Sequence, residues 1–135
     1  MMNLEARMRA AWIALPLALS MAGCATMHTG LSSSAQRMER SSELMERNAD
    51  DRGIREDARQ LSAETRDFRE TVADSKADRD DIRGAFDDLS RSYHSLRDEV
   101  EKSQDRESER DFDAVTSAYL DIEREINRSD RYARD

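Results

Sequence analysis

"IREDARQLSAETRDFRETVADSKADRDDIRGAFDDLSRSYHSLRDEVEKS" (residues 54–103) carries the hydrophobic pattern that decides the fold. Its mostly apolar positions alternate four and three residues apart and are flanked by charged residues. This heptad pattern is typical of a helix that packs along another helix with a left-handed supercoil. The positions are Ile54, Ala58, Leu61, Thr65, Phe68, Val72, Ser75, Arg79, Ile82, Phe86, Leu89, Tyr93, Leu96, Val100 and Ser103.

Two successive positions in the middle of this pattern are polar, Ser75 and Arg79. The segment Ser75–Asp78 also resembles a capping box, which would begin a new helix there. One interpretation is a single helix about 75 Å long, at about 1.5 Å per residue, that tolerates a polar layer. The alternative is a hairpin of two helices. The unbroken register favours the single long helix.

Further amphipathic patterns flank the central stretch. A helix is predicted to begin at a cap near Ser108–Asp111, with an apolar face made by Phe112, Val115, Tyr119, Ile122 and Ile126. A weaker pattern at Ala35, Met38, Met45 and Ala49 predicts an upstream helix that ends near residues 50–53. Because no proline follows Pro16 and glycine is scarce, a β-protein is disfavoured. We therefore predict an all-α region over residues 34–135, either an elongated coiled coil or a small antiparallel helical bundle.

The apolar stripe of such a helix must be covered, because helices of this kind gain their stability from packing. The last helix, a second copy of the chain or a helical protein partner could cover it. Charged residues make up 39% of the sequence, against about 25% in an average globular chain. Disorder of residues 25–135 until a partner binds is therefore a third possibility.

The amino-terminal residues have the features of a secretory signal. Arg7 and Arg9 precede the apolar residues 10–19, and small residues follow. The apolar run is too short to span a bilayer, which takes about 20 residues, and Pro16 interrupts it. Met8 could also serve as the start, because the same pattern remains after it. We expect residues 1–23 to be a cleaved signal peptide.

The end of that signal, Met21-Ala22-Gly23-Cys24, resembles the lipobox of bacterial lipoproteins. The resemblance implies that a dedicated peptidase recognises Met21, Ala22 and Gly23, and that Cys24 then carries a diacylglycerol and an amide-linked acyl chain such as palmitate. Several chains together anchor a protein stably where one does not. An ordinary signal cleavage that leaves a free thiol, and an uncleaved anchor, are the alternatives.

The same resemblance implies a location. In that family an Asp after the cysteine favours retention in the inner membrane, and Ala25 stands there in this chain. The expected location is therefore the outer membrane, with the chain facing the periplasm. Residues 24–33, with their Gly and Ser content, are predicted to form a lipidated flexible tether.

Motifs of catalysis or ligand binding do not emerge from the sequence. His28 and His94 are far apart, so zinc ligands at short spacing are missing, and no nucleophile elbow or phosphate-binding loop occurs. A net charge of −8 argues against nucleic-acid binding. We expect no enzyme activity, no catalytic or cofactor-binding residue, no metal and no small-molecule substrate.

Two functions are compatible with these observations. The first is a structural or scaffolding role in the cell envelope, held to the membrane by the lipid; the plan is similar, in architecture only, to helical murein lipoproteins. The alternative is a helix-binding module, such as a periplasmic chaperone, a secretion accessory or an envelope-stress regulator, whose open stripe receives a partner helix. In either case we expect a homo-oligomer or a helical protein partner.

Overall fold

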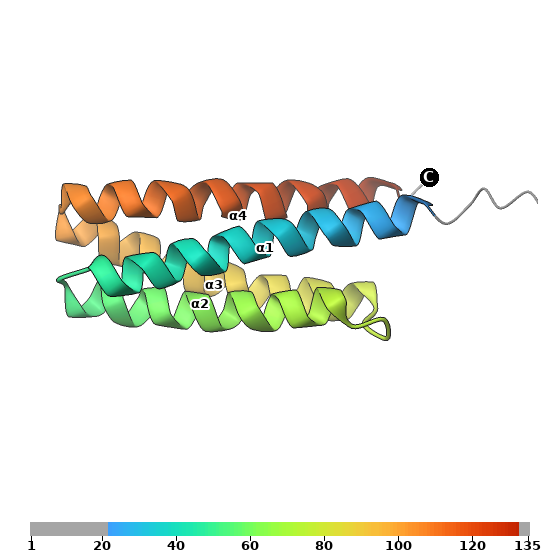
Figure 1. Cartoon of the computed structure of the whole chain (residues 1–135), viewed down its shortest axis with the longest axis horizontal. Coiled ribbons are helices and arrows are strands. Elements are labelled where there is room, and N and C mark those ends of the chain that lie inside the picture. Colours follow the sequence, from blue (N-terminus) through green and yellow to red (C-terminus); the bar gives the residue numbers. More distant parts are fainter. Residues whose placement is uncertain (1–21, 133–135) are drawn as a thin grey trace, which may run out of the picture.

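The computed structural model describes residues 22–132, which fold into an antiparallel bundle of four helices (Figure 1). These are α1 (Ala22–Asn48), α2 (Arg52–Ala73), α3 (Arg79–Ser103) and α4 (Arg106–Tyr132). Helix α1 packs against α2 and α4, and α3 packs against the same two helices. The all-α prediction is confirmed, in its small-bundle form. The longest helices have 27 residues, so the bundle is about 40 Å long at about 1.5 Å per residue.

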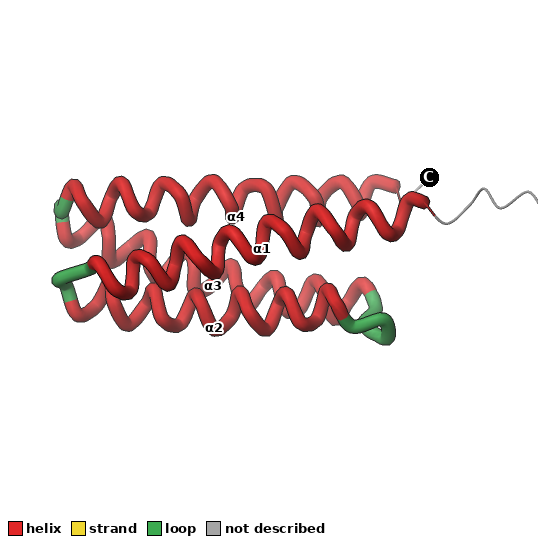
Figure 2. The backbone as a smooth tube through the Cα atoms, viewed as in Figure 1, coloured by secondary structure: helices red, strands yellow, loops and turns green. Residues whose placement is uncertain are grey.

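The two ends of the bundle differ in their connections (Figure 2). At one end, called the closed end, residues 49–51 join α1 to α2 and residues 104–105 join α3 to α4. The other end, called the open end, contains the turn of residues 74–78 between α2 and α3, together with the start of α1 and the end of α4. The predicted attachment site therefore lies at the open end.

Each helix contributes core positions that alternate four and three residues apart, as expected for this kind of helix packing. On α2 and α3 these positions match the heptad predicted from the sequence, which is confirmed. Ile82 and Phe86 are half-buried, and the other members are buried. The members are Leu31, Ala35, Met38, Ser42, Met45 and Ala49 on α1; Ile54, Ala58, Leu61, Thr65, Phe68 and Val72 on α2; Ile82, Phe86, Leu89, Tyr93, Leu96 and Val100 on α3; and Ser108, Phe112, Val115, Tyr119, Ile122 and Ile126 on α4.

The prediction of one long helix over residues 54–103 is wrong, because the chain reverses direction in the turn of residues 74–78. Asp78 and Asp81 form a reciprocal capping box: each carboxylate accepts a hydrogen bond from the backbone N–H of the other residue, at 2.9 Å. The cap of the new helix, Asp78, thus lies three residues after the predicted cap at Ser75. Ser75 and Arg79 are exposed, so neither places a polar group in the core.

The prediction of a flexible tether at residues 24–33 is also wrong, because this segment is the first part of α1. Leu31 is only 2% exposed, and it stands in register with Ala35 and Met38 of the same apolar stripe. Burial of this stripe offsets the low helix propensity of the Gly and Ser residues around it. The helical region therefore extends before the predicted boundary at residue 34.

The remaining helix ends lie close to their predicted places. Helix α1 ends at Asn48, where Arg55 donates hydrogen bonds to the carbonyl oxygen atoms of Ala49 (3.1 and 3.3 Å) and Asp50 (3.2 Å). Helix α4 begins before the predicted cap at Ser108. The Asp105 carboxylate accepts hydrogen bonds from the Ser108 hydroxyl (2.7 Å) and from the N–H groups of Ser108 (3.1 Å) and Glu107 (3.2 Å).

Within residues 22–132, no helix combines the length and apolarity needed to cross a bilayer.

Candidate functional site

The predicted lipid-attachment residue, Cys24, lies in the first turn of α1, at the open end. Ala22 and Gly23 precede it in the same turn, whereas Met21 and the rest of the predicted signal lie outside the described residues. The side chains of residues 22–28 are likewise outside the description. Any lipid on Cys24 would therefore be carried on a helix of the bundle.

The beginning of α1 is held in place by packing against α4. A Cβ atom added at Gly30 would lie 3.7 Å from the carboxyl carbon of Glu125, so the side chain of this α4 residue lies over α1 at this point. The neighbouring Leu31 is buried, and the Ser33 hydroxyl donates to the carbonyl oxygen of Gly30 at 2.9 Å. This segment is therefore an integral part of the bundle.

Ion pairs further along α1 join it to both neighbouring helices. The Glu39 side chain, only 9% exposed, forms ion pairs with Arg66 and Arg69 of α2, each at 3.0 Å. On the other side, the Asp121 carboxylate of α4 pairs with Arg37 of α1 at 2.6 Å. Because Glu39 is largely shielded from water, its two charge-assisted contacts contribute more than exposed pairs do.

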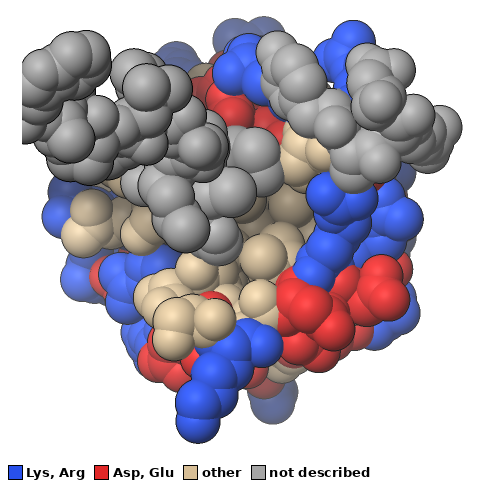
Figure 3. All heavy atoms as spheres, turned by 90° about the vertical axis from the view of Figure 1, so that its right-hand side faces the viewer, with Lys and Arg blue, Asp and Glu red and all other residues tan. Residues whose placement is uncertain are grey.

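An apolar hollow of about 190 Å³ lies at the open end. Its uncharged walls come from Leu31 of α1, Ala77 of the turn, Ile82 of α3 and Ile126 of α4. Figure 3 looks onto this end and shows uncharged surface between groups of charged side chains. The hollow forms because α2 ends at Ala73, so the outermost core layer lacks a contribution from that helix.

Charged and polar groups edge this apolar hollow. Arg83 of α3 forms an ion pair with Asp130 of α4 across the helix interface. Asp78, Arg79 and Ser129 complete the lining. The hollow thus has an apolar floor and a charged rim, an arrangement suited to a short apolar segment rather than to a charged ligand.

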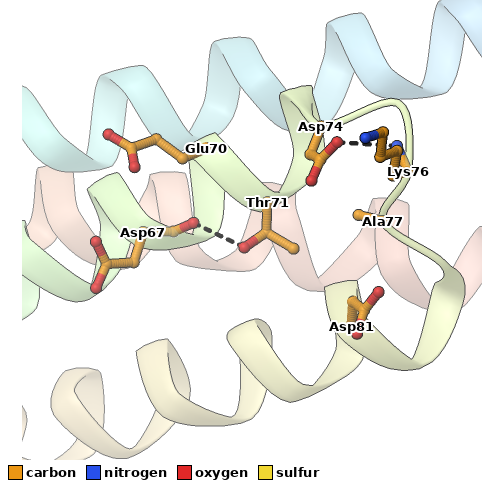
Figure 4. Close-up of a pocket in the computed structure, with 7 residues that line it drawn as sticks. All are labelled: Asp67, Glu70, Thr71, Asp74, Lys76, Ala77 and Asp81. Carbon is orange, nitrogen blue, oxygen red and sulfur yellow. Dashed lines mark hydrogen bonds between the residues drawn. The ribbon is translucent and has the colours of Figure 1, made fainter.

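A wider and more open hollow of about 530 Å³ lies beside the turn between α2 and α3 (Figure 4). Its lining is mainly acidic: Asp67, Glu70, Thr71, Asp74, Lys76, Ala77 and Asp81. The labelled carboxylates point in different directions, and Asp74 accepts a hydrogen bond from the N–H of Lys76 at 2.9 Å. Over residues 22–132, no group of three or more His, Cys, Asp or Glu residues could hold a metal ion. This surface is a solvated acidic face.

Stacked aromatic rings fill the space between α3 and α4. The rings of Tyr93 and Tyr119 are parallel with centroids 3.9 Å apart, and Phe86 and Phe112 extend the stack at 5.8 and 5.4 Å. The Tyr119 hydroxyl shares a hydrogen bond of 2.7 Å with Ser90. This arrangement agrees with the core-packing interpretation of the aromatic residues.

Tyr119 and His94 lie in different environments within and beside this stack. Burial raises the pKa of Tyr119 above its ordinary value of 10.0, and the hydrogen bond with Ser90 partly opposes that rise. His94 is exposed, with its ring edge-on to Tyr93 at 5.3 Å. Tyr119 is therefore placed as a packing residue, and His94 as a surface residue at the edge of the stack.

The comparisons with known proteins return no relative: no protein-family model, curated protein or solved structure matches this chain.

Lipid attachment at Cys24 stays a prediction, whereas the apolar hollow was missed by the sequence analysis. One sequence signal did indicate that α1 extends to this end of the bundle. Cys24, His28 and Leu31 continue the spacing of four and three residues that the core positions have farther along the helix. This extension places Cys24 on the same register position as the buried stripe. The hollow itself depends on where α2 ends, which the heptad pattern does not fix.

Proposed function

We propose that this chain is an outer-membrane lipoprotein that faces the periplasm, anchored by acyl chains on Cys24, with a structural or scaffolding role in the cell envelope. The observation that carries the proposal is the sequence Met21-Ala22-Gly23-Cys24, which follows an arginine-flanked apolar run and leads directly into a helix of a charged bundle. Acyl chains at this position would hold the bundle against the bilayer.

The shape of the bundle supports a short stand-off from the membrane. A bundle about 40 Å long is shorter than the rod of about 75 Å that the long-helix interpretation implied. Because α1 begins at Ala22, the attachment residue and the bundle are joined without a linker. The proposed scaffold would therefore present its closed end and its charged sides at a defined distance from the bilayer.

The alternative of a helix-binding module has less support. It requires an open apolar stripe, but the stripe on α2 and α3 is covered by α1 and α4. A client helix could enter only if the bundle opened, which would expose core residues such as Leu61 and Leu89. The same covering removes one argument for a second copy, because α1 and α4 of the same chain already pack on the stripe. Homo-oligomerisation and a helical protein partner stay predictions.

Mass spectrometry of the protein extracted from membranes tests the anchor. We expect an amino terminus at Cys24 that carries acyl mass, and loss of both processing and membrane fractionation in the variant Cys24→Ser. Ala25→Ser is the matched control, because it adds a hydroxyl next to the thiol and keeps the thiol. Intact residues 1–23, or an unmodified thiol, would overturn the proposal.

A bundle swap tests the structural role. Cells that lack the chain would be complemented with the natural protein, or with the same leader and Cys24 fused to an unrelated four-helix bundle of equal length. If the bundle acts only as a spacer, both versions should restore the resistance of the envelope to detergent. Rescue by the natural bundle alone would instead favour specific recognition by its surface.

A further inference from the structure

The apolar hollow at the open end lies close to the proposed site of lipid attachment. Leu31 forms its wall on α1, and Cys24 stands seven residues earlier on the same helix. Seven residues are about two helical turns, so the two positions share one face of α1 about 10 Å apart. An apolar group linked to Cys24 would thus begin within reach of the hollow.

Helix α2 does not extend alongside the first turns of α1. Thr29 and Ser32 of α1 lie level with Val72 and Ala73, the last residues of α2. The turns of α1 before Thr29 therefore extend past the end of α2, as Figure 1 shows. The side of α1 that faces the core farther along the bundle has no α2 residue opposite it here.

We propose that the hollow binds one alkyl chain of the lipid on Cys24, and that this chain folds back against the bundle. This inference rests on the proposed function. Attachment on the same helix face gives that chain a high effective concentration at the hollow, which a bilayer phospholipid does not have. The chain exchanges one apolar environment for another, whereas the half-buried Ile82 in the wall loses contact with water; Leu31 and Ile126 are already buried.

The rim is compatible with such an occupant. The stems of Arg79 and Arg83 can cover an alkyl chain while their guanidinium groups stay in water. The hollow has the liquid volume of roughly six water molecules at about 30 Å³ each, so it would hold only part of a chain. Binding of one chain in the hollow would fix the rotation of the bundle relative to its lipid. The other acyl chains would still insert into the membrane.

Photo-cross-linking tests the proposal on the whole mature protein. Cells are grown with a fatty acid that carries a diazirine group, and the purified lipoprotein is reconstituted into probe-free vesicles of phosphatidylethanolamine and phosphatidylglycerol and irradiated. We expect intramolecular adducts on peptides that contain Leu31, Ile82 or Ile126. Adducts confined to vesicle lipids or to other peptides would overturn the inference, even when Cys24 carries acyl mass.

A matched pair of variants makes the test specific. Ser129 lines the hollow, and Ser103 lies at the closed end; both are half-buried, and each donates to the carbonyl oxygen three residues earlier. Ser129→Phe should fill the hollow and reduce the adducts about tenfold, because the tethered chain loses its binding site. Ser103→Phe should leave them unchanged.

A second variant and a second placement of the probe complete the test. Ala77→Met adds bulk from the turn without altering a helix, so it should also reduce the adducts if Ser129→Phe proves unfolded by circular dichroism. Probe placed in the vesicle phospholipids instead should not label the hollow; labelling there would overturn the assignment to the chain on Cys24. Absence of acyl mass on Cys24 would defeat the proposed function itself, and the inference with it.

Discussion

The closed and open ends of the bundle differ in their turns, in their helix caps and in how deeply their core residues are buried. At the closed end the turns are short, Ile54 is fully buried, and Arg55 and Asp105 satisfy the backbone groups of adjoining helix ends. At the open end the turn has five residues, 74–78, and Ile82 lies half-buried beside an apolar hollow. The difference indicates that packing and capping are more complete at the closed end than at the open end, where the proposed attachment residue Cys24 lies.

Two matched isoleucine truncations should give the largest contrast between the ends. Ile54 and Ile82 are each the first core residue of their helix. Ile54→Ala should lower the free energy of unfolding by about 3–4 kcal/mol, because it removes a fully buried side chain. Ile82→Ala should cost about 1 kcal/mol, because that side chain is already half exposed. Urea denaturation followed by helical circular dichroism measures both, and equal losses would contradict the comparison.

The helix caps provide a second test of the comparison. Asp78 caps α3 at the open end, and Asp78→Ala should lower the free energy of unfolding by about 1 kcal/mol. Asp105 accepts three hydrogen bonds at the closed end. We expect the loss on Asp105→Ala to exceed that on Asp78→Ala in the same urea measurement. A larger loss at Asp78 would mean that the open-end turn contributes more to the fold than its exposure indicates.

Gly84 offers a stabilising change near the open end. It lies inside α3, and an added Cβ would meet no atom within 4 Å. Gly84→Ala should therefore raise the free energy of unfolding by about 0.5–1 kcal/mol, because alanine loses less backbone entropy on forming a helix. Thermal melting checks this change. A lower melting temperature would show that the surface at Gly84 makes a contact that the added methyl group disturbs.

Acidification should act selectively on the closed end. Hydrogen bonds from the Ser108 hydroxyl, and then from the N–H groups of Ser108 and Glu107, lower the pKa of Asp105. The stability from this carboxylate is complete above its ordinary pKa of about 3.9 and is lost as the pH falls through the lowered pKa. The variant Asp105→Asn cannot titrate, so its urea midpoint should fall less than that of the natural protein on acidification. Parallel curves for the two proteins would contradict this origin.

The heptad on residues 54–103 predicted which residues are buried but not how the chain connects them. Its register runs without interruption through residues 74–78, although these residues form a turn. A turn of this length can preserve the spacing by coincidence, so periodicity alone does not separate a long helix from a hairpin. The exposed polar residues Ser75 and Arg79 were the better signal, because a core position rarely tolerates both.

The start of α1 was missed for a related reason. The Gly and Ser residues near Leu31 are typical of a linker, and local composition therefore predicted a tether. The alternation from Leu31 through Ala35 to Met38 was nevertheless present in the sequence. Burial against α2 and α4 outweighs local propensity here, because packing supplies most of the stability of such helices. The hollow could not be predicted, because it arises from the unequal lengths of neighbouring helices.

Hydrogen exchange on the mature protein in vesicles most directly tests the central claim, that the proposed attachment residue Cys24 is joined to the bundle without a flexible linker. We predict that the amides of residues 26–33 exchange much more slowly than those of the turn at residues 74–78, because they are hydrogen-bonded within α1. Exchange of residues 26–33 as fast as that of the turn would contradict the claim. It would mean that the bundle hangs from the membrane on a mobile segment.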